Sequence, residues 1–143
     1  VFKSFLLSNT VKKYNAPIYK YRIGSEGQSV SVIGRLKHSK DAERVLDEIL
    51  DLYKKEEHSL SMMKKKVLWH TVKVVAWFQY TTYLLFEDSR KSRHQLKEYE
   101  RKLKINCKPL YKELGMESKV VTLLRLSNYY MYGMARRHVM DRL

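Results

Sequence analysis

The sequence predicts an all-α protein, a helical bundle of about four to five helices. Its composition supports this: 44% of the 143 residues are hydrophobic, and only 5 Gly and 2 Pro occur, as in a folded chain with few obligatory turns. From residue 39 onward, apolar side chains recur at helical spacing. Strand-like alternation is confined to a short extended stretch near the N-terminus, which a short helix over residues 1–14 precedes.

Residues 39–57 give the clearest predicted helix. Acidic Asp41 and Glu43 lie in its first turn and basic Lys54 and Lys55 in its last, an arrangement that complements the helix dipole. The spacing of its apolar residues predicts one stripe that must pack against another helix. The stripe consists of Ala42, Val45, Leu46, Ile49, Leu50, Leu52 and Tyr53.

Residues 59–86 form the most apolar segment, with almost no polar face. A helix that is apolar nearly all round is expected in the middle of a bundle. We do not predict a membrane span, because His70, Lys73 and Gln79 interrupt the segment and would be costly to bury in lipid.

The remaining third of the chain predicts two further helices. Asp88 or Ser89 caps a helix over residues 89–104. Residues 105–115 contain a proline and a glycine and predict a break that holds at most one helical turn. A last helix over 117–141 follows, and we expect its apolar residues to face the core. These are Val120, Val121, Leu123, Leu124, Leu126 and Tyr130.

The chain is strongly basic, with 29 Lys and Arg against 15 Asp and Glu, a net charge of +14. Such a field favours polyanions: nucleic acid, anionic lipid or phosphate-bearing substrates. A basic all-helical nucleic-acid-binding module is therefore one functional hypothesis. It is the less favoured one, because the charge is diffuse and no helix-turn-helix signature is present. The lone Cys107 excludes an internal disulfide and indicates a reducing, cytoplasmic compartment.

One stretch differs from the rest of the chain. Aromatic and cationic residues alternate, and then two glycines among serines interrupt the pattern. An arginine at the edge of a Gly/Ser loop suits an oxyanion, because its guanidinium and nearby backbone N–H groups are donors. A hairpin that only links a strand to a helix is the alternative. The stretch reads Tyr19-Lys20-Tyr21-Arg22-Ile23-Gly24-Ser25-Glu26-Gly27-Gln28-Ser29-Val30-Ser31.

The runs Ile18–Gly24 and Gly27–Ser31 resemble the closing segment of the catalytic domain in bacterial family 2 glycosyltransferases of the GT-A type. The resemblance implies that residues 1–33 are the C-terminal edge of that α/β domain and that 34–143 are a C-terminal helical domain. Ser25 stands where many relatives carry a basic residue. The residues that the resemblance places on the donor-phosphate or acceptor side are Arg22, Ser25, Gly27, Gln28 and Ser29.

The resemblance also implies an activity for a longer parent protein. Such enzymes transfer a sugar from a nucleotide-sugar donor to a cell-surface glycan or lipid-linked acceptor, with Mg²⁺ or Mn²⁺ at an Asp-x-Asp motif. Neither that motif nor an acidic base is identifiable here, so we expect no catalytic residue, metal or cofactor in this chain. We expect the catalytic domain upstream, and the chain does begin at Val1 with no signal-peptide pattern.

Two basic clusters are predicted to contact an anionic membrane or another polyanion: Lys64, Lys65 and Lys66, and Arg136 with Arg137. The alternative for the lysines is a solvated helix end. A membrane contact would place the protein at the inner face of the membrane as a peripheral component. The helical domain would then pack against the catalytic domain, pair subunits into a homo-oligomer, or position the acceptor.

Overall fold

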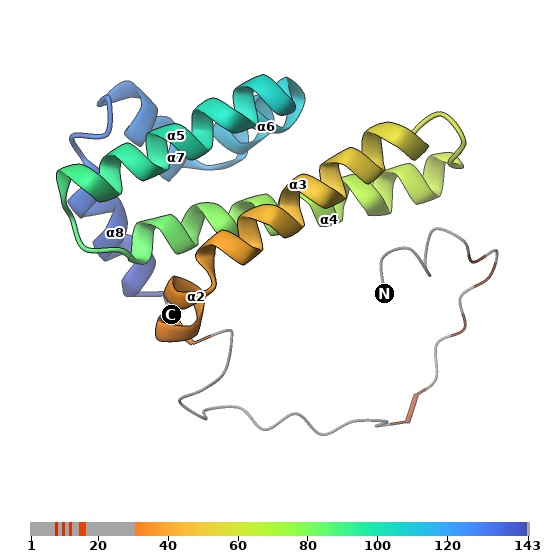
Figure 1. Ribbon diagram of the computed structural model, residues 1–143, viewed down its shortest axis with the longest axis horizontal. Coiled ribbons are helices and arrows are strands. Elements are labelled where there is room, and N and C mark those ends of the chain that lie inside the picture. Colours follow the sequence, from red (N-terminus) through yellow and green to blue (C-terminus); the bar gives the residue numbers. More distant parts are fainter. Residues whose placement is uncertain (1–7, 9, 11, 13–14, 17–30, 143) are drawn as a thin grey trace.

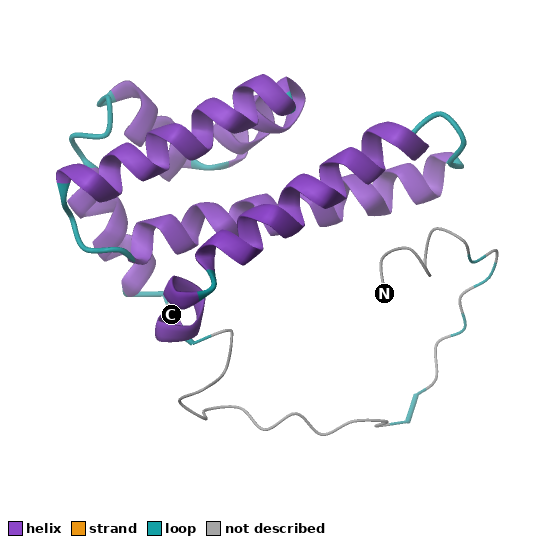
Figure 2. Ribbon diagram, in the orientation of Figure 1, coloured by secondary structure: helices purple, strands orange, loops and turns teal. Residues whose placement is uncertain are grey.

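The computed structural model describes residues 8, 10, 12, 15, 16 and 31–142. Within them the chain is all-helical and contains no strand, which confirms the predicted fold class (Figure 2). The predicted helix over residues 1–14 and the extended segment after it lie outside the described residues, apart from a few isolated positions. Their assignment to an α/β catalytic domain stays a prediction.

Seven helices make up the described part. They are α2 (Val32–Lys37), α3 (Ser39–Glu56), α4 (Met62–Leu85), α5 (Arg90–Asn106), α6 (Lys108–Glu117), α7 (Lys119–Leu126) and α8 (Tyr132–Met140). In Figure 1, α3 and α4 run side by side in opposite directions, and α2 and α8 lie near the C-terminal end of α4. Helix α5 packs against α4 and α6. Helix α6 also contacts the N-terminal half of α4, where Trp69 Nε1 donates to Glu113 and Lys73 pairs with Glu117, and α7 packs against α6.

Side-chain caps explain where several helices begin. Ser61, Ser89 and Ser118 accept hydrogen bonds from the backbone N–H groups three residues ahead, at the starts of α4, α5 and α7. Such caps satisfy amide groups that have no partner within the helix. Of the two predicted caps for α5, it is therefore Ser89 that performs this role, while Asp88 binds Arg93.

Buried tyrosines join the helices of the core. The ring centroids of Tyr83 and Tyr99 are 5.2 Å apart. The Tyr99 hydroxyl donates to the carbonyl of Ala76 at 2.9 Å, and the Tyr132 hydroxyl donates to the carbonyl of Tyr83 at 2.5 Å. These rings bring large apolar area into the core, and each hydroxyl keeps a partner there, as a buried phenol requires.

The predicted break at 105–115 is wrong, because α6 occupies most of it. Pro109 lies in the first turn of α6, where its missing N–H costs nothing and its fixed φ favours a helix. Gly115 lies near the end of α6, and a Cβ atom there would collide with the Arg125 guanidinium. A larger residue at this position would therefore displace the end of the Arg125 side chain.

The predicted single helix over 117–141 is also wrong. It divides into α7 and α8, because Asn128 and Tyr129 adopt left-handed backbone conformations with φ of 48° and 67°. Asparagine tolerates this region, but a tyrosine in it is unusual and needs support from the surrounding structure. Three residues expected in the core, Leu123, Leu126 and Tyr130, lie exposed on α7 and beside this turn.

Helix α2, which we did not predict, is held on α4 by Arg35. The Arg35 side chain is buried, and its guanidinium donates to Thr81 Oγ1 at 2.6 Å and to the Phe78 carbonyl at 2.9 Å. Its Cζ atom lies 4.1 Å from the centroid of the Phe78 ring. Hydroxyl, carbonyl and aromatic groups thus compensate the buried cation.

Helix α4 is less enclosed than its composition predicted. One side packs against the other helices through Leu68, Val72 and Ala76, which are buried. The opposite side carries an apolar stripe at helical spacing that remains exposed to solvent. We call it the outer stripe of α4. It consists of Met63, Val67, Val74, Trp77 and Phe78.

Candidate functional site

The sequence-predicted site residues fall into three groups. Arg22, Ser25, Gly27, Gln28 and Ser29 lie outside the described residues. The residue that ends this run, Ser31, is described, and its Oγ atom accepts a hydrogen bond from Gly34 N at 3.1 Å, at the start of α2. The predicted glycine-serine run therefore leads directly into the bundle.

The two predicted basic clusters lie at opposite ends of α4. Lys64, Lys65 and Lys66 occupy its first turns, whereas Arg136 on α8 donates its Nε–H to the carbonyl of Phe86, just past the C-terminus of α4, at 2.9 Å. With a rise of 1.5 Å per residue, about 30 Å separates the two ends. They do not form one compact patch.

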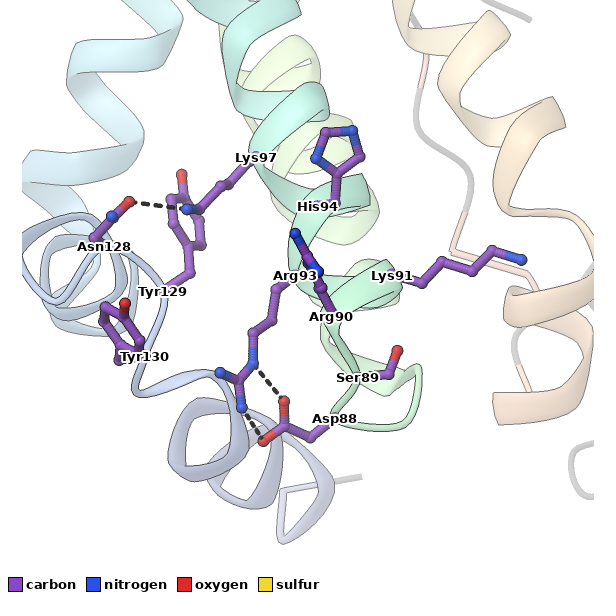
Figure 3. Close-up of a pocket in the computed structure, with 10 residues that line it drawn as sticks. All are labelled: Asp88, Ser89, Arg90, Lys91, Arg93, His94, Lys97, Asn128, Tyr129 and Tyr130. Atoms are coloured by element: carbon purple, nitrogen blue, oxygen red, sulfur yellow. Dashed lines mark hydrogen bonds and ion pairs between the residues drawn. The ribbon is translucent and has the colours of Figure 1, made fainter.

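A third basic surface, which the sequence analysis did not identify, surrounds a groove of about 860 Å³. One wall is the segment Asp88–Lys97 at the start of α5, and the other is the left-handed turn Asn128–Tyr130 between α7 and α8 (Figure 3). We call this cavity the α5 groove. Its walls come from parts of the chain about thirty residues apart, so helical periodicity alone could not bring them together.

Positive charge dominates the α5 groove. Arg93 is neutralised by Asp88, since its Nε and Nη2 atoms donate to the two carboxylate oxygens at 2.7 and 2.9 Å. Lys97 donates to the side-chain oxygen of Asn128 at 2.9 Å. Because this oxygen is neutral, it does not compensate the positive charge of Lys97. Arg90 and Lys91 are exposed and make no ion pair within the described part of the chain. Three cationic side chains, Arg90, Lys91 and Lys97, therefore have no carboxylate partner among the residues that the structure describes.

These cations stand at the unfavourable end of a helix. The first turn of α5 contains no acidic residue, although it contains Arg90, Lys91 and Arg93. A cation near a helix N-terminus opposes the helix dipole, typically by about 0.3–1 kcal/mol. A sequence that departs from local preference in this way often does so at a functional site. This charge pattern is the signal in the sequence that could have indicated the groove.

A buried polar network holds the turn that forms the second wall. Glu100 Oε2 accepts hydrogen bonds from the Tyr129 hydroxyl at 2.6 Å and from Arg125 Nε at 2.9 Å. The Arg125 Cζ atom also lies 3.7 Å from the centroid of the Tyr111 ring. Burial and the hydrogen bond to Glu100 raise the pKa of the Tyr129 hydroxyl well above its usual value, so it remains a donor at neutral pH.

The network also determines which aromatic ring faces the groove. Tyr129 is drawn inward by Glu100, and the Lys97 ammonium lies 5.2 Å from the centroid of its ring. The next residue, Tyr130, is 77% exposed. The α5 groove therefore combines three uncompensated cations with one open aromatic ring.

The described residues were also compared with the requirements of a metal site and of a membrane-spanning helix. Among residues 31–142 and the few described before them, no cluster of His, Cys, Asp and Glu side chains is suited to hold a metal ion. In the same part of the chain, no helix has the length and apolar character to cross a bilayer.

No family model, no curated protein and no solved structure matches this chain.

Proposed function

We propose that the chain is the C-terminal accessory helical region of a family 2 glycosyltransferase. The parent enzyme would transfer a sugar from a nucleotide-sugar donor to a cell-surface glycan or lipid-linked acceptor, with Mg²⁺ or Mn²⁺ bound upstream. The observation that carries this proposal is the run Ile18–Ser31, with its spaced arginine, glycines and serines. On this proposal the protein acts in the cytoplasm, with a peripheral position at the membrane.

The attachment of α2 supports a structural role for the helices. Ser31 ends the glycine-serine run and caps α2, and four residues later Arg35 is fixed on α4. Anything that precedes Ser31 is therefore tethered at a defined place on the bundle. A domain tethered in this way is present at high effective concentration next to α4.

The outer stripe of α4 offers that domain a surface. Phe78 belongs to the stripe and also contacts Arg35, so the chain reaches the bundle directly beside it. Exposed apolar stripes of this kind are typical of interaction surfaces. We assign the stripe to the catalytic domain that would precede Ser31.

A first prediction tests the enzyme assignment. In the full-length enzyme, replacing Arg22 with alanine should reduce sugar transfer at least tenfold while the protein stays folded, because a charged donor to phosphate would be lost. Lys20→Ala is the matched control, since it removes a cation from the same run and should change transfer less than twofold. Equal kinetics of Arg22→Ala and wild type would remove Arg22 from the site.

A second prediction tests the outer stripe. Val74 is 51% exposed, so Val74→Asp should change the stability of this chain alone by less than about 0.5 kcal/mol. In the full-length enzyme it should separate the domains and speed proteolysis near residue 31. Leu126→Asp, at a more exposed apolar position on α7, is the control.

Two results would contradict the assignment of the outer stripe. One is a full-length enzyme that resists protease equally with and without Val74→Asp. The other is a homodimer of the isolated chain that sedimentation detects for wild type and that Val74→Asp dissociates, because the stripe would then bind a second copy of the chain.

A nucleic-acid-binding module is the second candidate, favoured by the three basic surfaces. Against it, α3 presents exposed Asp47, Glu48 and Asp51 alongside α4, between the basic ends. A duplex carries a phosphate charge about every 1.7 Å and would need a continuous positive track. Tight binding of duplex or single-stranded DNA with a steep salt dependence would raise this candidate above the first.

A further inference from the structure

We propose that the turn between α3 and α4 inserts into the interface of an anionic lipid bilayer, with methionines at the acyl chains and lysines at the phosphate groups. We call residues 54–66 the hairpin tip. The inference deepens the proposed function, and it rests on that proposal only for the peripheral membrane position. The exposure and the charge of the hairpin tip are observed independently of the sugar-transfer assignment.

The hairpin tip projects from the bundle. In Figure 1, the turn between α3 and α4 lies past the ends of α5 and α6. Where the hairpin meets α6, the ring centroids of Tyr53 and Trp69 are 5.1 Å apart, and Trp69 Nε1 donates to Glu113 at 3.1 Å. Nearer the turn, Met62 and Met63 are 69% and 71% exposed. Adjacent apolar side chains exposed to this degree at a projecting end mark a candidate interaction surface.

Helix geometry directs the two methionines outward. In a helix, every Cα–Cβ bond tilts toward the N-terminus, and Met62 and Met63 open α4, so their side chains project toward the turn. Lys66 follows Met62 by four residues, which places its Cα atom about 6 Å behind. Apolar side chains thus lead and cations follow within about one turn. The same order suits a bilayer interface, where apolar groups enter the acyl boundary and lysines reach the headgroups.

Positive charge dominates the hairpin tip, which contains five lysines and two glutamates. Two of the lysines end α3 and three begin α4. The first turn of α4 contains no acidic residue, so the positive end of its dipole adds to the field of the lysines. An anionic lipid surface attracts each cation held close to it. Four of the lysines make no ion pair with any described residue, namely Lys54, Lys55, Lys65 and Lys66.

The methionines favour a lipid surface over other polyanions. A phosphate backbone attracts the lysines equally well, but it offers no apolar surface to Met62 and Met63, whereas acyl chains do. The unbranched methionine side chain also adapts to a surface without fixed shape. Farther along the hairpin, Asp47 and Glu48 of α3 are exposed and would repel a nucleic acid that continued past the hairpin tip.

Co-sedimentation of the whole chain with vesicles tests the proposal. One set of vesicles is phosphatidylcholine alone, and the other is an equal mixture of phosphatidylcholine and phosphatidylglycerol. We expect binding to the anionic vesicles to be at least about tenfold tighter, and to weaken as salt screens the lysines. Equal binding to both sets, or no binding to the anionic set, would overturn the proposal.

Charge variants locate the contact. Replacing three exposed lysines of the hairpin tip with glutamine should weaken binding to anionic vesicles at least about tenfold, whereas the same change at three exposed cations near the other end of α4 should alter it less than about twofold. An equal loss from both sets would show that only the net charge matters and would contradict the site. The test set is Lys54→Gln, Lys55→Gln and Lys66→Gln, and the control set is Lys37→Gln, Arg90→Gln and Lys91→Gln.

Methionine variants separate insertion into lipid from simple attraction between charges. Met62→Ser with Met63→Ser leaves the net charge unchanged and should weaken binding to anionic vesicles at least about fivefold, because less apolar area is buried. Met116→Ser with Met134→Ser, at positions that are 83% and 61% exposed, is the matched control and should leave binding within about twofold of wild type. Unchanged binding of the first pair would make the hairpin tip a general polyanion site and would refute insertion.

Other occupants and the enzyme assay give distinct outcomes. If a short oligothymidylate binds more tightly than the anionic vesicles, with the same loss in the lysine test set, the hairpin tip is a nucleic-acid site and the proposal fails. It also fails if the wild-type chain sediments as a dimer that the Met62 and Met63 changes dissociate. Vesicle binding as expected, with no sugar transfer by the full-length enzyme, would keep the hairpin tip and remove the enzyme assignment. Transfer without vesicle binding would have the opposite meaning.

Discussion

Replacing Arg125 with alanine should lower the free energy of unfolding by about 3–5 kcal/mol, the range typical when one partner of a buried ion pair is removed. The side chains of Glu100 and Arg125 are 4% and 18% exposed. Without Arg125, Glu100 would keep only the Tyr129 hydroxyl as a side-chain donor and would remain a buried charge. Chemical denaturation of the variant and the wild type measures the difference.

Arg101→Ala is the control for this prediction. Arg101 also pairs with a glutamate, Glu98, but that pair is exposed at the surface, so its loss should cost much less stability than the loss of Arg125. Replacing Glu100 and Arg125 together with leucine should recover most of the stability, because no charge is then left buried. A loss from Arg125→Ala no larger than that from Arg101→Ala would contradict the role of the network.

Acidification should remove a separate part of the stability through Glu43. Burial alone would raise the pKa of Glu43, but hydrogen bonds from Lys102, Lys40 and Tyr83 outweigh it and lower the pKa from 4.5 to about 2. The Lys102 ammonium lies 2.6 Å from Glu43 Oε1, and the Tyr83 hydroxyl lies 2.8 Å from Oε2. The folded state therefore favours the ionised carboxylate.

The sign follows from the lowered pKa. Above pH 4.5, the ordinary pKa, this contribution is fully present, and it is lost as the pH falls through about 2. It should amount to about 1–3 kcal/mol, since solvent partly screens the two lysines. Denaturation at several pH values should show a gap between wild type and Glu43→Gln that is largest at pH 7 and closes toward pH 2.

Two further observations make the Glu43 experiment decisive. Asp47 acts in the opposite direction, because partial desolvation of this surface side chain and the nearby Glu43 carboxylate raise its pKa, so only the difference between wild type and variant isolates Glu43. Glu48→Gln, at an exposed position on α3, is the control for the same chemical change. A gap for Glu43→Gln that stays constant between pH 7 and pH 2 would contradict the account.

The sequence predicted the long helices well for a physical reason. In α3, α4 and α5 the apolar residues repeat at helical spacing over many turns, and serine or acidic residues mark the starts. Such signals are local and need no knowledge of the rest of the fold. The buried positions Leu46 and Leu50 were correctly expected in the core.

The features of the fold that the sequence did not predict depend on contacts between residues far apart in the chain. Helix α2 is short, and it is held by Arg35 through Thr82, 47 positions away. The division between α7 and α8 depends on the bond between Tyr129 and Glu100, which are 29 positions apart. Neither contact can be predicted from helix propensities or from the spacing of apolar residues. Tertiary interactions overrode the local helical pattern at these positions.

The candidate site was likewise only partly predictable from the sequence. The charge excess and the arginine-glycine run were visible in the sequence, whereas the α5 groove was not, because its second wall exists only where the last predicted helix breaks. Val45 and Leu126 were expected inside and lie exposed. Helical spacing identifies a stripe, but it does not determine whether another helix covers all of it.

The proposed function makes this chain the C-terminal helical region of a sugar-transferring enzyme. The most direct measurement is release of nucleotide from a panel of nucleotide sugars, in Mg²⁺ or Mn²⁺, by the full-length enzyme and by the 143-residue chain alone. The account predicts metal-dependent release by the full-length enzyme and none by the chain. Turnover by the isolated chain, or a full-length protein that processes no nucleotide sugar, would contradict it.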